Sequence, residues 1–394
     1  MSTRPPVENW STDFDHLDPR WVEDPYPIWD GLRESCPVAH TDRYRGVYFP
    51  SRFEDVRAVA YDTEHFSSRR IIVRSTPPPR IPAPPITSDP PEHRAAKNLL
   101  LPAFTPDAIQ AHEPRAREIC RHLIDRFADK RGCDAAVDYA QDIPPRIIAH
   151  MLGLPEEEGD LFRKWIHEIL EVGITEPAVL MKALGETNEY FAAEVAKRRA
   201  APRDDLISYL VTAEIDGQPL AEDHLLGTIR LLLIAGIDTT WSAIGSCFWH
   251  LAQHPQDRQR LAAEPTLIPT AVEEFLRAYA PVTMAREVVK EISINGCPFT
   301  PGEMVLLSFP AANRDPAVFA EADRVLIDRK ENRHAAFGLG IHRCIGSNLA
   351  RMELRVALEE WMARYPDFEL TDPDAVTWSA GQVRGPRTIP VRVP

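Results

Sequence analysis

The sequence has 394 residues, of which 44% are hydrophobic and 26% charged, and it carries a formal net charge of −14 with a pI near 5.4. This composition is typical of a globular protein with a large core, and the acidic balance argues against nucleic acid or anionic lipid as a non-specific partner. Residues 1–30 contain no basic segment followed by an apolar run, so we expect neither a signal peptide nor a membrane anchor. The six cysteines show no C-x2-C spacing, which favours reduced thiols in a cytoplasmic protein.

A strand followed by a helix is expected near the N-terminus. The stretch RGVYFPSRFEDVRAVAYD, residues 45–62, changes from apolar strand-like residues to helical spacing at Ser51. Glu54 follows Ser51 by three residues, which is the spacing of a capping box. We therefore predict that this pair begins the helix.

A proline-rich stretch, TPPPRIPAPPITSDPP, occupies residues 76–91. So many prolines exclude a helix interior and predict a stiff, partly polyproline-like loop. The loop is either a simple connector or, as long loops in compact domains often are, part of a functional site.

The middle of the chain is predicted to be mainly helical. From about residue 107 to residue 263 apolar residues recur at intervals of three and four, and Thr105 followed by Pro106 is typical of an N-cap and first helical position. Short alternating runs flank Asn-Gly at 295–296, which predicts a hairpin. Since no repeat or flexible linker divides the chain, we expect one domain over residues 1–394, mainly α with a smaller β region.

The most apolar stretch, residues 225–255, is predicted to form a long buried helix. Its segment 231–249 is long enough to span a bilayer, but Asp238 near its centre would be unfavourable in lipid, and no second span is evident. Within it, AGIDTT at 235–240 combines a helix-weakening glycine with hydroxyls that can bond backbone carbonyls. We expect a kink or widening there.

A single cysteine, Cys344, stands in a glycine-rich stretch just before a further predicted helix. Gly338 and Gly340 allow tight turns and a close approach to a flat group, and Gly346 keeps the following helix near. If this helix begins at Cys344, its unpaired N–H groups stabilise a thiolate, which is a strong metal ligand. The alternatives are a buried structural cysteine and a zinc site shared with His342, for which no second ligand pair is evident.

The ten residues FGLGIHRCIG, 337–346, match the signature F-G-x-G-x-H-x-C-x-G throughout, and the chain resembles the haem-thiolate monooxygenases of the cytochrome P-450 family. The resemblance implies the single-domain fold of that family, with haem b between the long helix at 225–255 and the cysteine loop at 337–346. It also implies that Cys344 is the axial ligand of the iron. The residues that it implies for haem binding are His93, Lys97, Ala235, Arg286, Phe337, Gly338, His342, Cys344, Gly346 and Ala350.

A structural pair of the family, E-x-x-R, is matched by Glu274 and Arg277. In the family a further basic residue joins this pair, and the candidates here are Arg324 and Arg329.

Other segments resemble the family in the correct order. TMAREV, residues 283–288, places Arg286 where relatives hold a haem propionate. The family commonly has H-x-x-x-R before the helical region, whereas here Lys97 follows His93, and a lysine lacks the planar fork of arginine.

AGIDTT resembles the oxygen-binding element of the family. The resemblance implies that Asp238 and Thr239 deliver protons during oxygen activation, which favours reductant-driven chemistry over that of peroxide-dependent relatives.

The function that the resemblance implies is insertion of one atom of O2 into a largely apolar small organic substrate, by hydroxylation or oxidative dealkylation. Electrons would come from NAD(P)H through a ferredoxin-type or fused reductase. The alternatives are the haem portion of a self-sufficient fused monooxygenase and a non-catalytic haem-binding or sensor protein. The residues expected to contact the substrate are Ile86, Thr87, Ser88, Val172, Ile174, Val282, Met284 and Val383.

A docking face for an acidic ferredoxin is expected on the thiolate side of the haem. The basic residues expected there are Arg94, Lys97, Arg333, Arg343, Arg351 and Arg355.

Overall fold

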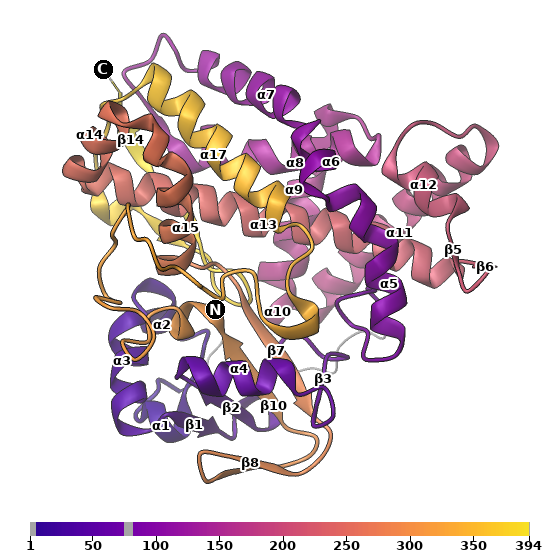
Figure 1. Cartoon of the computed structure of the whole chain (residues 1–394), viewed down its shortest axis with the longest axis vertical. Coiled ribbons are helices and arrows are strands. Elements are labelled where there is room, and N and C mark those ends of the chain that lie inside the picture. The colour runs from indigo at the N-terminus through magenta and orange to yellow at the C-terminus, as the bar shows by residue number, and fades with distance from the viewer. Residues whose placement is uncertain (1–4, 75–81, 394) are drawn as a thin grey trace.

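Helices make up most of the chain, and they pack around one long central helix, α13 (Glu222–Gln253) (Figure 1). The computed structural model describes residues 5–74 and 82–393. The N-terminal helices are α1 (Trp10–Asp13), α2 (Pro19–Glu23), α3 (Tyr26–Ser35), α4 (Phe53–Tyr61), α5 (Glu92–Leu100), α6 (Pro106–Gln110), α7 (Glu113–Asp125) and α8 (Ile143–Leu152). The later helices are α9 (Gly159–His167), α10 (Gly173–Thr175), α11 (Pro177–Ala200), α12 (Leu206–Thr212), α14 (Pro255–Ala263), α15 (Ile268–Ala278), α16 (Phe309–Ala312) and α17 (Ser347–Arg364). The mainly helical middle of the chain is thus confirmed.

Apolar side chains around α13 explain its position. Within the described residues one helix, α13, has the length and composition of a membrane span, and 72% of its most apolar 18-residue stretch is buried inside the protein. It forms the centre of the largest hydrophobic cluster, together with α7, α8, α15 and α17. A core helix of a globular protein can have the same length and composition as a membrane span. Because α13 is mostly buried, the predicted long buried helix is confirmed.

The widening expected at 235–240 is wrong, because α13 is α-helical throughout, and the expected kink stays a prediction. Gly236 packs directly against Ile148 of α8, where an added Cβ would lie 3.3 Å from the Ile148 side chain. Thr239 Oγ1 donates a hydrogen bond to the carbonyl of Ala235 at 2.7 Å without interrupting the helix. Packing against α8 therefore supports the helix at this stretch despite its weak local propensity.

The smaller β region, predicted from the sequence, is built around a five-stranded sheet of order β1-β2-β10-β7-β3. Its strands are β1 (Val38–Thr41), β2 (Val47–Pro50), β10 (Met304–Ser308), β7 (Thr283–Val288) and β3 (Phe66–Ser67). The remaining strands are β4 (Gly132–Asp134), β5 (Glu214–Ile215), β6 (Gln218–Pro219), β8 (Ile292–Ile294), β9 (Cys297–Phe299), β11 (Glu369–Leu370), β12 (Thr377–Trp378), β13 (Pro386–Thr388) and β14 (Pro390–Arg392). β10 pairs parallel with β2 and antiparallel with β7. The sheet lies on the far side of the cysteine loop from the helical bundle (Figure 1).

One predicted hairpin turn and one predicted helix cap are confirmed. Asn295 and Gly296 join β8 to β9 with φ angles of 52° and 77°, the left-handed conformation that this residue pair tolerates. Thr105 caps α6, since its side chain accepts the N–H of Ala108, and Pro106 is the first helical residue.

The predicted capping box at the start of α4 is wrong, although the strand and the helix themselves are confirmed. The helix begins at Phe53, and its N-cap is Arg52, whose side chain makes no capping hydrogen bond. The N–H of Phe53 instead donates to Asp315 at 2.8 Å, and the hydroxyl of Ser51 donates to the carbonyl of Pro37. A carboxylate that lies distant in sequence thus replaces the local cap.

A buried ion cluster joins α15 to the chain before the cysteine loop. Glu274 and Arg277 form a two-pronged ion pair at 2.8 Å, and both side chains are 0% exposed. Arg329 completes the cluster, since its Nε donates to Glu274 at 2.9 Å. Arg324 contributes only its backbone carbonyl, which accepts from Arg277, and its side chain pairs with Glu321 at the surface. Arg329, and not Arg324, is therefore the basic residue whose side chain joins the pair of Glu274 and Arg277.

Candidate functional site

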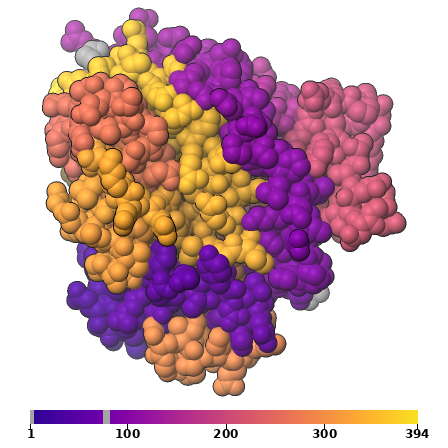
Figure 2. Space-filling view, viewed as in Figure 1, coloured from indigo at the N-terminus to yellow at the C-terminus, as the bar shows by residue number. Residues whose placement is uncertain are grey.

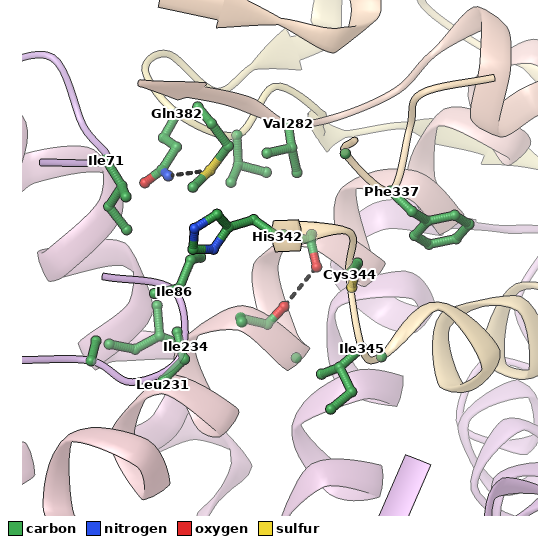
Figure 3. A pocket seen from close by; sticks show the side chains of 18 of the residues that line it. Ile71, Ile86, Leu231, Ile234, Val282, Phe337, His342, Cys344, Ile345 and Gln382 are labelled. Atoms are coloured by element: carbon green, nitrogen blue, oxygen red, sulfur yellow. Dashed lines mark hydrogen bonds between the residues drawn. The ribbon is translucent and has the colours of Figure 1, made fainter. Parts of the chain in front are cut away.

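A cavity opens between α13 and the loop that carries Cys344. Figure 3 shows Cys344 and Ile345 on one side of this cavity, Ile71 and Ile86 on the other, and His342 between them. Further walls come from β7, from the start of α17 and from the turn that carries Gln382 and Val383. Helix and loop, distant in sequence, thus face a common space.

The cysteine loop is held by its own backbone. The N–H of Cys344 donates to the carbonyl of Phe337 at 2.7 Å, and Gly338 and Gly340 have φ angles of 71° and 66°. A Cβ on Gly340 would lie 2.4 Å from the carbonyl oxygen of Ala60 in α4. Glycine is therefore required at this position both for its conformation and for the close approach.

The expectation that a helix begins at Cys344 is wrong, because α17 begins at Ser347. Ile345 and Gly346 separate Cys344 from the helix, so the thiol remains in the loop, where it lines the cavity. The Cys344 side chain is exposed to the cavity, and its position inside the protein raises the pKa of the thiol, while the N–H of Gly346 and the charges of Lys97 and Arg343 oppose that rise. A cation bound at the sulfur would favour the thiolate outright.

Three basic side chains gather on the cavity wall beside the cysteine loop. The rings of His93 and His342 are 4.4 Å apart and nearly perpendicular, and His342 Nε2 lies 2.8 Å from the hydroxyl of Ser68. Burial and the nearby charge of Arg286 lower the pKa of His342 to about 3. Burial also lowers the pKa of Arg286 to about 10, against the opposing charge of Asp89. His93, His342 and Arg286 are called the basic cluster below.

Lys97, which departs from the family pattern, supports the cysteine loop. Its Nζ donates to the carbonyl of Ile341 at 2.5 Å and to the carbonyl of Arg343 at 2.9 Å. These two bonds tie α5 to the backbone on either side of His342. The lysine thus has a bonding role within the protein that requires only a point charge.

A haem fits this combination of groups. A cysteine sulfur lines the cavity, the basic cluster offers buried donors for acidic groups, and the long wall of α13 presents small residues such as Ala235 and Gly236. A buried cation such as Arg286 is unfavourable without an anionic partner, and a haem propionate would supply one.

The acid and the alcohol of AGIDTT lie in different environments. Thr239 lines the cavity, whereas Asp238 is 1% exposed and is not among the cavity-lining residues. Its Oδ1 accepts from Arg387 at 2.8 Å and from Ser242 at 3.3 Å. Burial raises the pKa of Asp238, and the charge of Arg387 opposes this.

Arg387 connects Asp238 to the helical segment that precedes α10. Its guanidinium also pairs with Glu171 at 2.6 Å, in the π-helical segment Glu168–Val172 that follows α9. The three charged groups thus bridge α13, the C-terminal strand β13 and the segment before α10.

The expected substrate contacts are brought together only in part. Those that line the cavity are Ile86, Thr87, Val282, Met284 and Val383. Ser88, Val172 and Ile174 are not among the residues that line it, and Ile169 and Leu170 take the place of the latter two. Residues 76–81 of the expected proline-rich loop lie outside the described residues.

Several residues that line the cavity were not predicted from the sequence. They are Ile71, Ile72, Leu231, Ile234 and Gln382. Leu231 precedes Ala235 and Thr239 by steps of four, so the helical period could have placed it on the same face. The isoleucines carry no such signal, because apolar pairs are usually core residues.

The fold and the site together define a haem-thiolate oxygenase, in which a cysteine loop and a helix hydroxyl face one largely apolar cavity. The cytochrome P-450 family model matches residues 169–377. The chain is 36% identical to mycinamicin IV hydroxylase/epoxidase of Micromonospora griseorubida over 91% of this chain and 93% of that protein. It is 33% identical to cyclomarin C epoxidase of Salinispora arenicola over 94% of each chain.

A solved structure agrees with this assignment. The cytochrome P-450 PksS of the bacillaene polyketide synthase of Bacillus subtilis 168 has a TM-score of 0.88 and 30% identity, covering 96% of this chain and 99% of that one. The chain therefore belongs to the cytochrome P-450 family and is a haem-dependent monooxygenase.

Proposed function

We propose that the chain inserts one atom of O2 into a largely apolar small organic substrate, by hydroxylation or oxidative dealkylation. The observation that carries the proposal is that Cys344 and Thr239 line one cavity whose other walls are mainly aliphatic. The relatives are named for hydroxylation and epoxidation of mycinamicin IV and for epoxidation of cyclomarin C, which supports oxygen insertion as the reaction. The whole chain is proposed to act as one haem domain in the cytoplasm.

Cys344 is proposed to hold haem b through its sulfur. The residues proposed to surround the cofactor are His93, Ala235, Arg286, Phe337, Gly338, His342, Gly346 and Ala350. The basic cluster would pair with the propionates, and Lys97 would hold the loop behind it. When bound, haem supplies oxygen activation, and thiolate ligation favours cleavage of the O–O bond.

Thr239 is proposed to hold and pass protons at the cavity wall. Its Oγ1 is both a donor and an acceptor, and Asp238 is the adjacent acid. Because Asp238 Oδ1 is held by Arg387 while Oδ2 has no hydrogen-bond partner, the carboxyl has a free site for a proton.

Thr239→Ala should keep haem and substrate binding but reduce the product formed per NAD(P)H consumed, by about tenfold or more if proton delivery is lost. The missing reducing equivalents should be recovered as hydrogen peroxide. The matched control is Ser246→Ala. The hydroxyl of Ser246 also donates to the carbonyl four residues earlier in α13, but Ser246 does not line the cavity. Unchanged coupling in Thr239→Ala would remove the residue from this role.

Electrons are proposed to arrive from an acidic ferredoxin on the face that carries α17. Figure 2 shows α17 and the segment before it beside the chain of α5 to α7 on one face. Arg351 pairs there with Glu273, and Arg355 with Glu113, so these two charges are already compensated. Among the described residues Arg94, Arg333 and Arg343 are exposed and form no ion pair, which makes them the stronger candidates for docking.

Arg94→Glu and Arg333→Glu should each slow reduction by an acidic ferredoxin at low salt, because electrostatic complementarity chiefly speeds encounter. The rate for the unmodified protein should fall as salt shortens the Debye length toward about 8 Å. Stopped-flow reduction measures both effects, and Arg203→Glu, at an exposed position between α11 and α12, is the control. Reduction that is indifferent to salt and to both reversals would exclude this face for the partner tested.

A further inference from the structure

Arg74 is a buried guanidinium in the cavity wall for which the described residues supply no hydrogen-bond or ion-pair partner. The residue is 7% exposed and lines the cavity. Its Nε and Nη1 make no hydrogen bond, and no carboxylate of the described residues pairs with it. The stretches outside the described residues contain no Asp or Glu. A buried cation in this state is unfavourable unless a ligand supplies the anion.

Three other arginines on the cavity wall differ from Arg74 because the protein itself supplies their partners, and Arg343, which also lines the cavity, is exposed. Arg69 pairs with Asp89 at 3.4 Å and Arg70 with Glu287 at 3.4 Å. Arg230 donates to the carbonyl of Pro82 at 2.9 Å and to the side chain of Asn188.

The position of Arg74 is fixed by the backbone that precedes it. The carbonyl of Ile71 accepts the N–H of Ala285 in β7 at 2.9 Å. Val73 is 2% exposed and packs in the cluster beneath the five-stranded sheet. A backbone hydrogen bond and core packing thus hold two of the three residues that precede Arg74.

Arg74 lies apart from the basic cluster proposed to bind the propionates. The ring of His93 lies against that of His342, His342 Nε2 lies 2.8 Å from the hydroxyl of Ser68, and Arg286 Nη1 donates to the carbonyl of Ala285 at 2.7 Å, so none of these contacts involves Arg74. Burial alone lowers the pKa of Arg74. A propionate at the basic cluster would therefore leave Arg74 without its anion.

We infer that Arg74 recognises a carboxylate on the substrate, which is then an aliphatic or aromatic acid whose apolar body lies along the isoleucine and leucine side chains of the cavity. This inference rests on the proposed function and names its substrate class. The planar fork of a guanidinium matches a carboxylate in a two-pronged pair. A single positive charge also balances a carboxylate, whereas a phosphate dianion would bring an uncompensated charge into a largely apolar cavity.

The test compares acids with their neutral esters. Decanoate and 4-tert-butylbenzoate, each against its methyl ester, are titrated into the haem-loaded protein, and binding is followed by the Soret spectrum and by isothermal titration calorimetry. The acid should bind about 10- to 100-fold more tightly than its ester, the range expected for a hydrogen bond to a charged group. Equal affinity of acid and ester, tighter binding of the ester, or binding of neither form overturns the inference.

Substitutions then locate the effect. Arg74→Gln should remove the preference for the acid while leaving ester affinity and haem content unchanged, and Arg74→Lys should retain part of the preference. Arg57→Gln, which removes one exposed charge from α4, should retain all of it. Loss of haem from Arg74→Gln together with equal weakening of acid and ester would assign Arg74 to the cofactor and overturn the inference.

Failure here is distinguishable from failure of the proposed function. The wild-type comparison of acid and ester needs no variant, so it stands even if Arg74→Gln does not fold. If the reduced protein has the carbon monoxide spectrum of a haem-thiolate protein but shows no acid preference, only the substrate class is wrong.

Discussion

Glu274→Ala should lower the free energy of unfolding by about 3–5 kcal/mol, the range for removing one partner of a buried ion pair. The substitution leaves Arg277 and Arg329 as buried cations, and it also removes the acceptor for the N–H of Leu326. The chain before the cysteine loop would lose its attachment to α15. Urea denaturation followed by circular dichroism measures the change, and the purified variant should also contain less haem.

The matched control for this prediction is Glu321→Ala. Glu321 and Arg324 have the same spacing as Glu274 and Arg277, but their side chains are 51% and 64% exposed. An exposed pair contributes about 0–1 kcal/mol, so the control should unfold close to the wild type. Similar destabilisation by the two substitutions would show that burial of the Glu274 cluster is not what makes it important.

Cys344→Ser should abolish NAD(P)H-driven product formation. A serine hydroxyl remains protonated at neutral pH and cannot supply the electron donation of a thiolate. Cys297→Ser, in the hairpin strand β9 away from the cavity, should retain activity. Product formation at the wild-type rate in Cys344→Ser would contradict the assignment of the ligand.

Local patterns predicted those parts of the fold that neighbouring residues decide. Thr105 with Pro106 and Asn295 with Gly296 act within a few residues of themselves, so the sequence was sufficient. The central helix was predictable because its apolar stretch is too long for a strand and carries an acid near its centre.

Long-range contacts decided the parts that failed. Phe53 begins α4 because Asp315, 262 residues away in sequence, accepts its N–H, and a local capping pattern contains no trace of that contact. The same holds for AGIDTT, where contact with Ile148 of a neighbouring helix keeps Gly236 helical.

The site was predictable where its functional residues lie in one contiguous motif. The loop at 337–346 indicated the ligand and its glycines, but not that α17 begins after Cys344. Arg329 could not be separated from Arg324 because both are basic and near in sequence, and only burial tells them apart. The role inferred for Arg74 could not be predicted from the sequence, because only the three-dimensional structure shows that its guanidinium is buried and unpaired among the described residues.

The absorption spectrum of the reduced protein under carbon monoxide decides whether Cys344 is the thiolate ligand of a haem in this chain. We expect the strongly red-shifted Soret band of thiolate ligation in the wild type and its loss in Cys344→Ser. A wild-type spectrum like that of a histidine-ligated globin, or an unchanged band in Cys344→Ser, would contradict it.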